Sequence, residues 1–521
     1  MSRKEFYITT AINYTNGSPH FGHAFEITVT DLIARFQRFL GRDVFFLTGT
    51  DEHGQKIADT AAAQKPPITP LALCDKYVAE FQSLNKQLNI SNDFYIRTTM
   101  EKHEECAKYI WELAAHSGDI YLGNYEGWYS KREERFLTEL EAKSLNYMDG
   151  DKSLTKTCES SYFFRLSKYQ DRLIEHIKTH PEFIFPPEKS NEIIERLKEP
   201  LNDLSISRTT FDWGVPIPHA FNGKQHMETQ KHVMYVWFDA LTNYLSGIDF
   251  PNGKSSRYWP ADMHVIGKDI AWFHAVIWPC MLFSVNIPLP KQIVCHGFVN
   301  SSDGRKMSKS YGNVVDPLDM LKRYTSDTVR YFMAREGAFG SDFSFNEKSL
   351  QDRYNGELAN NFGNLVQRSL NLATSYCDSK VPIEEAIPII NLELLSQNVE
   401  KMFKELHIQS AVQVIFEAMT EVNRWLTVEE PWKLKGVEHA AKRRIIVRTL
   451  LEVLYILGHF IMPIMPVASE ELFNRLGKQP IHLPELLKSS WKHLESHSPV
   501  KVGDPLFPRL GSYRDSKKTT A

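Results

Sequence analysis

The chain has 521 residues, 42% of them hydrophobic, so it is long enough to bury large cores and to divide into about three or four domains. Its 61 Lys and Arg residues nearly balance 64 Asp and Glu residues, which excludes a polybasic protein that holds nucleic acid by bulk charge alone. None of the six cysteines belongs to a Cys-x-x-Cys pair, so neither a disulfide framework nor a four-cysteine zinc site is indicated. The N-terminus lacks the apolar stretch of a secretory signal, and we expect a cytoplasmic protein.

The first fifty residues predict the opening of a parallel α/β sheet. A β-prone run at 6–10 precedes a helical stripe that ends at Gly41, and a buried strand follows at 44–47. The stripe consists of Val29, Ile33, Phe36 and Leu40. The alternation returns with a strand at 264–266, a helix over 270–283 interrupted near Pro279, and a strand at 293–295. The sequence therefore predicts one sheet that is split by an insertion.

The remaining segments complete a predicted fold class. Residues 121–217 scatter aromatics among charges, which indicates an inserted connective domain, and residues 350–476 carry helical stripes with few glycines or prolines. We therefore expect an α/β protein with a split Rossmann-like parallel-sheet domain and an inserted domain, followed by an α-helical bundle. The expected boundaries are 1–120 and 218–300 for the two halves of the sheet domain, 121–217, 301–349, 350–476, and 477–521 for a C-terminal tail.

Two apolar stretches require a check for membrane spans. Residues 271–290 contain His274 and Pro279, and residues 445–468 contain Arg448 and Glu452. A spanning helix needs about 20 nearly uncharged residues. Because Arg448 and Glu452 stand four apart, the second stretch predicts a buried bundle helix with a narrow polar stripe, and no membrane association is expected.

The turn after the first strand is a candidate phosphate site. The chain has neither a P-loop nor a Gly-x-Gly-x-x-Gly turn there, but Gly17 and Gly22 let the backbone approach a ligand. His20 and His23 lie three apart at a helix start, where the helix dipole and free N–H groups favour anions. Taken alone, the pair is equally compatible with a capped turn carrying two surface histidines, or with half of a metal site.

A second candidate is the loop over 301–313, in which glycines and hydroxyl residues flank Lys306 and Lys309. It is either a solvated basic loop or a mobile clamp that places ammonium groups on a triphosphate. Transfer at phosphorus depends on that kind of positioning and charge compensation.

These two segments carry a resemblance to a known family. His20-Phe-Gly-His23 resembles the HIGH signature of class I aminoacyl-tRNA synthetases, and Lys306-Met-Ser-Lys-Ser310 matches their KMSKS signature. Further stretches are similar to the methionine-specific members, namely Ala11–Tyr14, Thr50–Gly54, Tyr235–Ala240, Ile266–Ile270 and Phe273-His274. The resemblance implies an enzyme that uses ATP and Mg²⁺ to form methionyl-adenylate from L-methionine and then charges tRNA(Met).

The resemblance also implies roles for individual residues. The catalytic set is His20, His23, Lys306, Lys309, Asp51 and Arg208. The residues that would bind ATP are His20, Gly22, His23, Lys306, Ser308 and Lys309. Asp51 would receive the α-ammonium group of methionine, and Arg208 would pair with Asp51. The methionine pocket would comprise Asp51 with Ile12, Tyr14, Trp237, Ala240, Tyr244, Asp269, Ile270, Phe273 and His274. Without the resemblance, the pocket residues would be ordinary core and Asp269 a helix N-cap.

The predicted bundle carries a further resemblance. Asn364, Arg368 and Trp432 match positions that read the anticodon in the family. Stacking an unpaired base on an aromatic ring while neighbouring side chains bond base edges is typical of single-stranded RNA recognition. The alternative is that Asn364 caps a helix and Trp432 belongs to the core.

One stretch departs from the family pattern. Ser130 and Glu133 stand where many relatives carry zinc-binding cysteines, so we expect no structural zinc. The chain ends soon after Leu506–Arg509 without an appended dimerising domain, and a monomer is expected. The rival interpretations are a synthetase for another amino acid, a nucleotidyltransferase that acts without tRNA, and an inactive RNA-binding relative.

Overall fold

The computed structural model describes residues 4–130, 135–137, 142, 154–218, 220–221, 224–225, 231–302, 304–305, 307, 313, 315–489 and 491–511. The chain forms two compact units. The first comprises residues 1–19, 44–85 and 92–296, and the second comprises residues 20–43, 86–91 and 297–521. The chain therefore passes from one unit to the other several times.

A parallel sheet forms the centre of the first unit. Its strands follow the order β2-β3-β1-β14-β15-β8, with β4 paired to β3. They are β1 (Glu5–Thr10), β2 (Asn13–Tyr14), β3 (Asp43–Asp51), β4 (Phe94–Arg97), β8 (Ile184–Phe185), β14 (Met263–Gly267) and β15 (Ile293–His296). β1 pairs in parallel with β14, β14 with β15, β15 with β8, and both β2 and β4 with β3. The predicted α/β class and the split of one sheet along the chain are confirmed.

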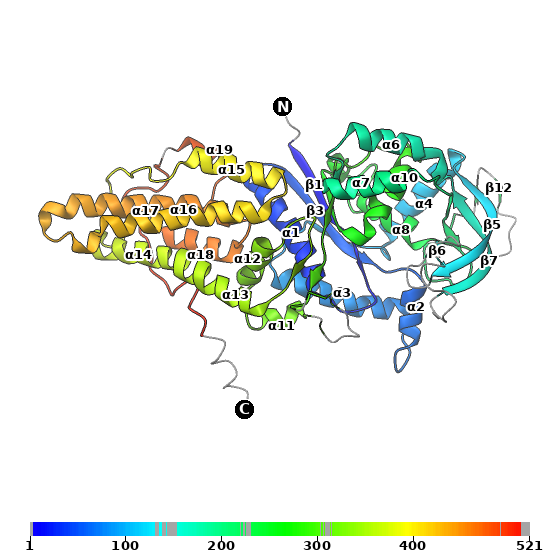
Figure 1. The fold of residues 1–521 in the computed structure, drawn as a ribbon, viewed down its shortest axis with the longest axis horizontal. Coiled ribbons are helices and arrows are strands. Elements are labelled where there is room, and N and C mark those ends of the chain that lie inside the picture. Colours follow the sequence, from blue (N-terminus) through cyan, green and yellow to red (C-terminus); the bar gives the residue numbers. More distant parts are fainter. Residues whose placement is uncertain are drawn as a thin grey trace. The chain divides into compact units, whose positions relative to one another are not determined.

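A second, antiparallel sheet is formed by strands between residues 120 and 205 and is drawn largely in cyan in Figure 1. Its order is β6-β5-β7-β9, with β5 (Ile120–Ser130), β6 (Arg135–Leu137), β7 (Leu154–Phe164) and β9 (Leu204–Ser205). The same segment contributes two helices, α6 (Gln170–Thr179) and α7 (Pro187–Arg196), and also β8 at the edge of the parallel sheet. Short two-stranded pairs join β10 (Ser207–Arg208) to β13 (Val233–Met234) and β11 (Ala220–Phe221) to β12 (Lys224–Gln225).

The helices of the first unit connect its strands. Besides α6 and α7, they are α2 (Gln55–Ala62), α3 (Pro70–Gln87), α4 (Glu101–His116), α8 (Val236–Leu241), α9 (Asn243–Ser246) and α10 (Trp278–Ser284). The predicted interruption near Pro279 is present, because a π-helical turn, Phe273–Ile277, runs directly into α10. Proline has no N–H to donate, so the regular i→i−4 ladder cannot continue through this position.

The second unit begins with α1 (Phe21–Phe39), which buries Val29, Ile33 and Phe36 of the predicted stripe. Leu40 is the C-cap and only half-buried, and the helix ends before Gly41, at φ 83°. A buried ion pair holds α1 to α12 (Ser326–Glu336): Arg330 Nη2 lies 2.7 Å from Asp31 Oδ2, and both side chains are fully buried. The Arg330 guanidinium also donates to the backbone oxygens of Leu88, Pro463 and Ile464. Such a pair is stable only when its remaining polar atoms are satisfied, as they are here.

The rest of the second unit is mainly helical, and α14, α16 and α17 run side by side (Figure 1). Its helices are α11 (Pro317–Leu321), α13 (Glu347–Arg353), the π-helical η7 (Tyr354–Gly363), α14 (Asn364–Cys377), α15 (Leu392–Lys404), α16 (Ile408–Glu429), α17 (Ala440–Ile461), α18 (Pro466–Leu476) and α19 (Leu483–Lys488). Two short strands of this unit, β16 (Val299–Asn300) and β17 (Phe343–Ser344), pair in parallel. This confirms the predicted helical bundle.

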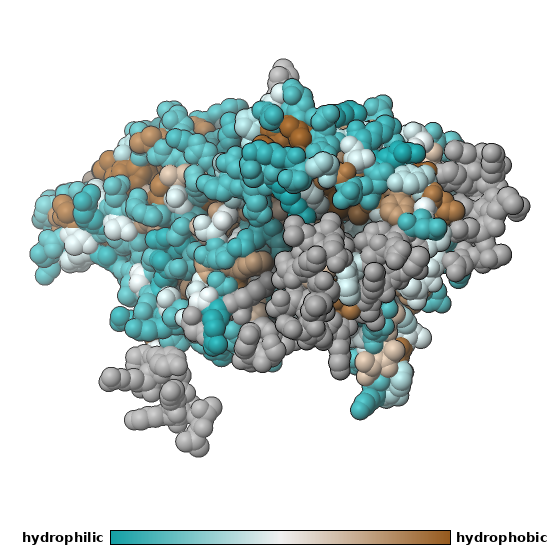
Figure 2. Space-filling model, turned by 45° about the vertical axis from the view of Figure 1, so that its right-hand side comes forward, coloured by the Kyte–Doolittle hydropathy of each residue, from teal (hydrophilic) through white to brown (hydrophobic). Residues whose placement is uncertain are grey.

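The polar stripe of α17 is buried as predicted. Arg448 Nη2 donates to Glu452 Oε1 at 2.8 Å, and Glu452 also accepts from the backbone N–H groups of His493 and Leu494. Within the residues that the structure describes, no helix is long and apolar enough to cross a membrane. On the face shown in Figure 2, hydrophobic residues form small patches separated by hydrophilic ones.

Candidate active site

His20 and His23 form a reciprocal cap at the start of α1. His20 Nδ1 accepts from the backbone N–H groups of Gly22 and His23, at 3.1 and 3.3 Å, and His23 Nδ1 accepts from the backbone N–H of His20 at 3.1 Å. The rings stack with their centroids 3.6 Å apart. Because each Nδ1 is an acceptor, the proton of each neutral ring lies on Nε2. The pair therefore presents two N–H donors at the positive end of a helix dipole, an arrangement suited to an anion.

Gly22 lies close to the His20 ring of this cap. An ideal Cβ on Gly22 would lie 3.0 Å from His20 Cε1 and 3.1 Å from His20 Nδ1. A side chain at this position would therefore require the His20 ring to shift by a few tenths of an ångström. The sequence predicted the two histidines on one helical turn, and the structure adds the reason for the glycine between them.

The second predicted phosphate-binding segment is not open to structural description. Lys306, Ser308 and Lys309 lie outside the described residues, so their assignment stays a prediction. The described neighbours show the base of this loop, where Ser301 N donates to Arg305 O and Asn313 Nδ2 donates to Ser301 Oγ.

In the first unit, two predicted methionine-site residues meet at the carboxyl end of the parallel sheet. β2 and β3 pair in parallel, with Tyr14 opposite Asp51. Thr15 secures this register, because its backbone N–H donates to Asp51 O at 3.1 Å. Asp51 is 9% exposed, and Ile12 and Tyr14 pack against the main hydrophobic core. The carboxylate thus lies at the carboxyl end of the strands, next to apolar side chains, and ligands of open α/β sheets bind at this end.

An aromatic stack joins two further predicted residues that are distant in sequence. The rings of Trp237, in α8, and Phe273 are parallel within 5°, with their centroids 3.7 Å apart. His274 presents its edge to Trp237 at 6.1 Å. Ala240, one turn after Trp237, is 4% exposed. A flat aromatic wall beside a small residue suits an unbranched, polarizable side chain.

His274 and Tyr244 share a hydrogen bond behind this wall. His274 Nδ1 donates to Ile270 O at 3.0 Å, so its Nε2 accepts from the Tyr244 hydroxyl at 2.7 Å. Burial lowers the pKa of His274 to about 4, against the smaller opposing effect of its bond to Ile270. The imidazole is therefore neutral at pH 7, and the predicted residues Tyr244, Ile270, Phe273 and His274 form one connected group.

Arg208 and Asp269 complete the predicted set in this unit. Arg208 is 2% exposed, and its Nη1 donates to Ser207 O at 2.7 Å and Ser205 Oγ at 2.9 Å, while the guanidinium lies 4.6 Å from the Tyr235 ring centre. Its pairing with Asp51 stays a prediction. Asp269 is exposed on a short 3₁₀ turn, Lys268–Ile270, whose N-cap residue is Gly267. Asp269 is therefore not the N-cap of that turn.

The motif that supplies Asp51 contains a buried charge network that the sequence did not predict. Arg97 binds Glu52 through two bonds of 2.7 and 2.9 Å, although Glu52 is fully buried. Thr98 Oγ1 accepts from Glu52 N, and Trp213 Nε1 donates to Glu52 O at 2.6 Å. The only signal in the sequence was two charged residues and a histidine in succession after a buried strand.

The three predicted RNA-reading residues lie in the second unit. Asn364 is exposed at the point where the π-helical η7 runs without a break into α14, so it caps no free helix N-terminus. Arg368, four residues later, holds its guanidinium 5.2 Å from the centre of the Trp432 ring. Trp432 is 42% exposed on a 3₁₀ turn, Pro431–Lys433, and is not a core residue. The structure thus brings Arg368 and Trp432 together at the surface.

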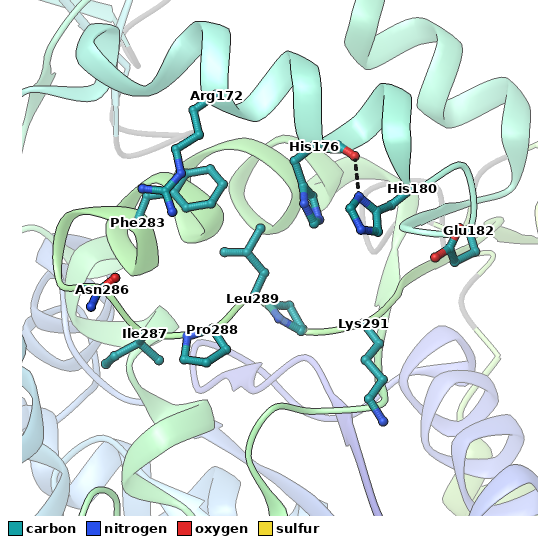
Figure 3. A pocket seen from close by; sticks show the side chains of 11 residues that line it. Arg172, His176, His180, Glu182, Phe283, Asn286, Ile287, Pro288, Leu289 and Lys291 are labelled. Atoms are coloured by element: carbon teal, nitrogen blue, oxygen red, sulfur yellow. Dashed lines mark hydrogen bonds between the residues drawn. The ribbon is translucent and has the colours of Figure 1, made fainter. Parts of the chain in front are cut away.

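A surface pocket of about 580 Å³ lies between α6 and the segment after α10 (Figure 3). None of the predicted site residues lines it. Its basic side chains are already engaged: Arg172 lies 4.0 Å over the Phe283 ring, and Lys291 pairs with Asp262 at 2.6 Å. His180 donates from Nδ1 to His176 O. This pocket therefore has no evident connection with the His20–His23 cap or with the Asp51 carboxylate.

Comparison with protein families gives two matches along the chain. The model of class I tRNA synthetases, type M, matches residues 6–145 and 142–370, and the model of the anticodon-binding domain of methionyl tRNA ligase matches residues 379–518. Together these matches cover most of the chain.

Individual relatives agree. A methionine–tRNA ligase of Brucella melitensis is 42% identical over 521 residues, with 98% of each chain covered. One of Mycobacterium bovis is 44% identical over 493 residues, with 92% of this chain and 93% of the relative covered. A solved structure of Mycobacterium tuberculosis methionyl-tRNA synthetase in complex with methionyl-adenylate aligns with a TM-score of 0.88, at 41% identity, over 97% of this chain and 100% of that one.

Proposed function

The chain belongs to the methionyl-tRNA synthetases of class I and is a methionine–tRNA ligase, and from this membership we propose which of its residues carry out the reaction. The enzyme activates methionine with ATP to methionyl-adenylate and transfers the methionyl group to the 3′ end of tRNA(Met). A carboxylate oxygen of methionine attacks the α-phosphorus, and pyrophosphate leaves. A hydroxyl of the terminal adenosine then attacks the acyl carbon, and AMP leaves.

In the activation step, the proposed catalytic groups act by placing positive charge and N–H donors against the triphosphate. His20 and His23 supply their Nε2–H donors, held by the reciprocal cap at the start of α1. Lys306 and Lys309 supply ammonium groups from the loop, and Ser308 a hydroxyl. The methionine carboxylate is already ionised at pH 7, so no general base is needed, and the rate depends on alignment and charge stabilisation.

Methionine recognition is proposed at the carboxyl end of the parallel sheet. The observation that carries this proposal is the register that sets Tyr14 opposite Asp51, which puts an aromatic ring beside the carboxylate expected to bind the α-ammonium group. The thioether would then contact the wall of Trp237 and Phe273, with Ala240 leaving room. Because His274 is neutral, it and the Tyr244 hydroxyl add polarity to the pocket without charge.

Binding of the tRNA anticodon is proposed at the surface formed by Asn364, Arg368 and Trp432. An exposed indole with a guanidinium over its face offers a stacking platform, and the exposed Asn364 amide can bond a base edge. Residues 350–476 would form the anticodon-binding domain, residues 301–349 the loop and stem-contact region, and residues 121–217 the connective insertion of a catalytic domain at 1–120 and 218–300.

The remaining proposals concern metals, assembly and location. Among the residues that the structure describes, no three His, Cys, Asp or Glu side chains form a group able to hold a metal ion. We therefore propose that Mg²⁺ arrives bound to the phosphate oxygens of ATP, and we assign it no protein ligand. We expect no structural zinc, and metal analysis of the purified enzyme tests this expectation. Light scattering tests the proposed monomer, and cell fractionation the proposed cytoplasmic location.

The decisive experiment is ATP–pyrophosphate exchange with each of the twenty amino acids. We expect methionine to support exchange, and preference for any other amino acid would overturn the pocket assignment. A nucleotidyltransferase that acts without tRNA would show exchange but no transfer to tRNA(Met).

A further inference from the structure

A buried carboxylate links the two halves of the proposed methionine site within the first unit. Asp239 belongs to α8, two residues after Trp237 and one before Ala240. Its Oδ2 lies 2.7 Å from His53 Nδ1, and its Oδ1 lies 2.7 Å from His103 Nε2 in α4. Asp239 and His103 are fully buried, and His53 is 4% exposed.

The charges at this link are compensated within it. Burial raises the pKa of Asp239, but the two histidines outweigh it and lower that pKa to about 2. Asp239 is therefore a carboxylate that can only accept, so both histidines donate to it. The second nitrogen of His103, Nδ1, lies 2.8 Å from Ser246 Oγ of α9. Burial opposes protonation of His53, but Asp239, with smaller contributions from Glu104 and Glu52, raises its pKa. The Trp213 ring stands edge-on to His53, with the ring centroids 5.6 Å apart.

His53 connects this carboxylate to Asp51. It follows Asp51 by two residues, and the residue between them is immobilised by Arg97, Thr98 and Trp213 as described above. Gly54 N also donates to Trp213 O at 3.1 Å. The turn after β3 is thus fixed to the sheet at Glu52 and to α8 at His53. Any movement of α8 away from this turn would require breaking a buried hydrogen bond to a carboxylate, which is costly.

We infer that Asp239 is a positioning residue for methionine, which sets the separation between the Asp51 carboxylate and the aromatic wall on α8. The inference rests on the proposed methionine site. The separation between the α-ammonium group of methionine and its thioether is bounded by the length of the side chain, so both ends bind well only if these two parts of the pocket stay within that range of spacing. Asp239 itself touches neither end in this arrangement.

Asp239→Asn tests the inference, because asparagine has the same shape but turns an N–H group towards one of the two histidine donors. We expect the KM for methionine in ATP–pyrophosphate exchange to rise at least tenfold, while the KM for ATP changes less than twofold. The matched control is Asp119→Asn, which removes another fully buried carboxylate of the same unit, one that accepts from Tyr169 and Ser284. This control should lose a similar amount of thermal stability and keep the wild-type KM for methionine.

A second pair of variants decides the question if Asp239→Asn does not fold. His53→Asn keeps an N–H donor near the position of Nδ1, whereas His53→Ala removes it, so the first should keep a KM for methionine much closer to wild type. Equal KM values in this pair, or equal effects of Asp239→Asn and Asp119→Asn, would overturn the inference. Trp237→Ala separates the two proposals. If it raises the KM for methionine and the Asp239 and His53 variants do not, only the positioning role fails; if it has no effect, the pocket assignment fails and the inference falls with it.

Discussion

Replacing Gly22 by alanine tests whether the histidine cap at the start of α1 positions the phosphates of ATP. The new Cβ would lie 3.0 Å from His20 Cε1, closer than side-chain atoms normally approach, so the His20 ring would have to shift by a few tenths of an ångström. We expect this shift to weaken the two bonds to His20 Nδ1 and to misalign the Nε2–H donor of His20 with the phosphate.

The expected magnitudes differ between stability and activity. Loss of an N-cap costs about 1 kcal/mol, and alanine in place of glycine in a helix returns up to about 1 kcal/mol, so the free energy of unfolding should change by less than about 1 kcal/mol. Loss of one hydrogen bond to a charged phosphate costs about 1.5–3 kcal/mol. At about 1.4 kcal/mol per tenfold, kcat/KM for ATP should fall roughly 10- to 100-fold.

The assay is methionine-dependent ATP–pyrophosphate exchange at varied ATP, accompanied by thermal unfolding. Gly356→Ala is the control, because a Cβ there meets nothing within 4 Å. It should leave kcat/KM for ATP unchanged. A Gly22→Ala enzyme that folds and retains kcat/KM for ATP within about twofold of wild type would refute the reasoning. A rise in the KM for methionine as large as the effect on ATP would refute it as well.

Three further predictions follow from other parts of the molecule. Trp432→Ala should weaken aminoacylation of tRNA while leaving ATP–pyrophosphate exchange nearly intact, and equal loss in both assays would make the residue structural. The folded pKa of His274, about 4, lies below its ordinary value of 6.5, so the unfolded chain binds the extra proton and the free energy of unfolding should fall as the pH drops from 6.5 to 4. His274→Asn should reduce that slope, measured by denaturation at several pH values, by up to about 1.4 kcal/mol per pH unit, and an unchanged slope would contradict the assigned burial effect. Arg330→Met should lower the free energy of unfolding by about 3–5 kcal/mol, since it leaves Asp31 buried beside fewer cations, and a loss below about 1 kcal/mol would show that the pair is dispensable.

Local periodicity made much of the fold predictable. A helix or strand that buries one face repeats apolar residues at its own period, and this spacing can be read from the sequence. It predicted the stripe of α1 and its end before Gly41, the buried strands β3, β14 and β15, and the core of α17. The reciprocal His20–His23 cap is also local, because it lies within one helical turn.

Non-local contacts were not predictable in the same way. β8 is a two-residue strand that pairs with β15, and nothing in so short a segment specifies its partner. The stack of Trp237 on Phe273 joins residues far apart in sequence, and only the family resemblance suggested that they share a pocket. Asp239 was missed because the sequence does not show that a charged residue is buried, and its two histidine partners come from separate segments.

The buried pair of Asp31 and Arg330 sets an order of events during synthesis of the chain. Asp31 leaves the ribosome first, and Arg330 follows 299 positions later. At about 5–20 residues per second, the apolar face of α1 and its buried carboxylate wait roughly 15 to 60 s for α12. Phe36 waits longer still for Phe403, on which its ring stacks at 3.9 Å. The helix that carries the histidine cap is thus synthesised among the first elements, but its apolar face is covered among the last. The nascent enzyme therefore lacks a complete core around α1 until most of the chain has been translated.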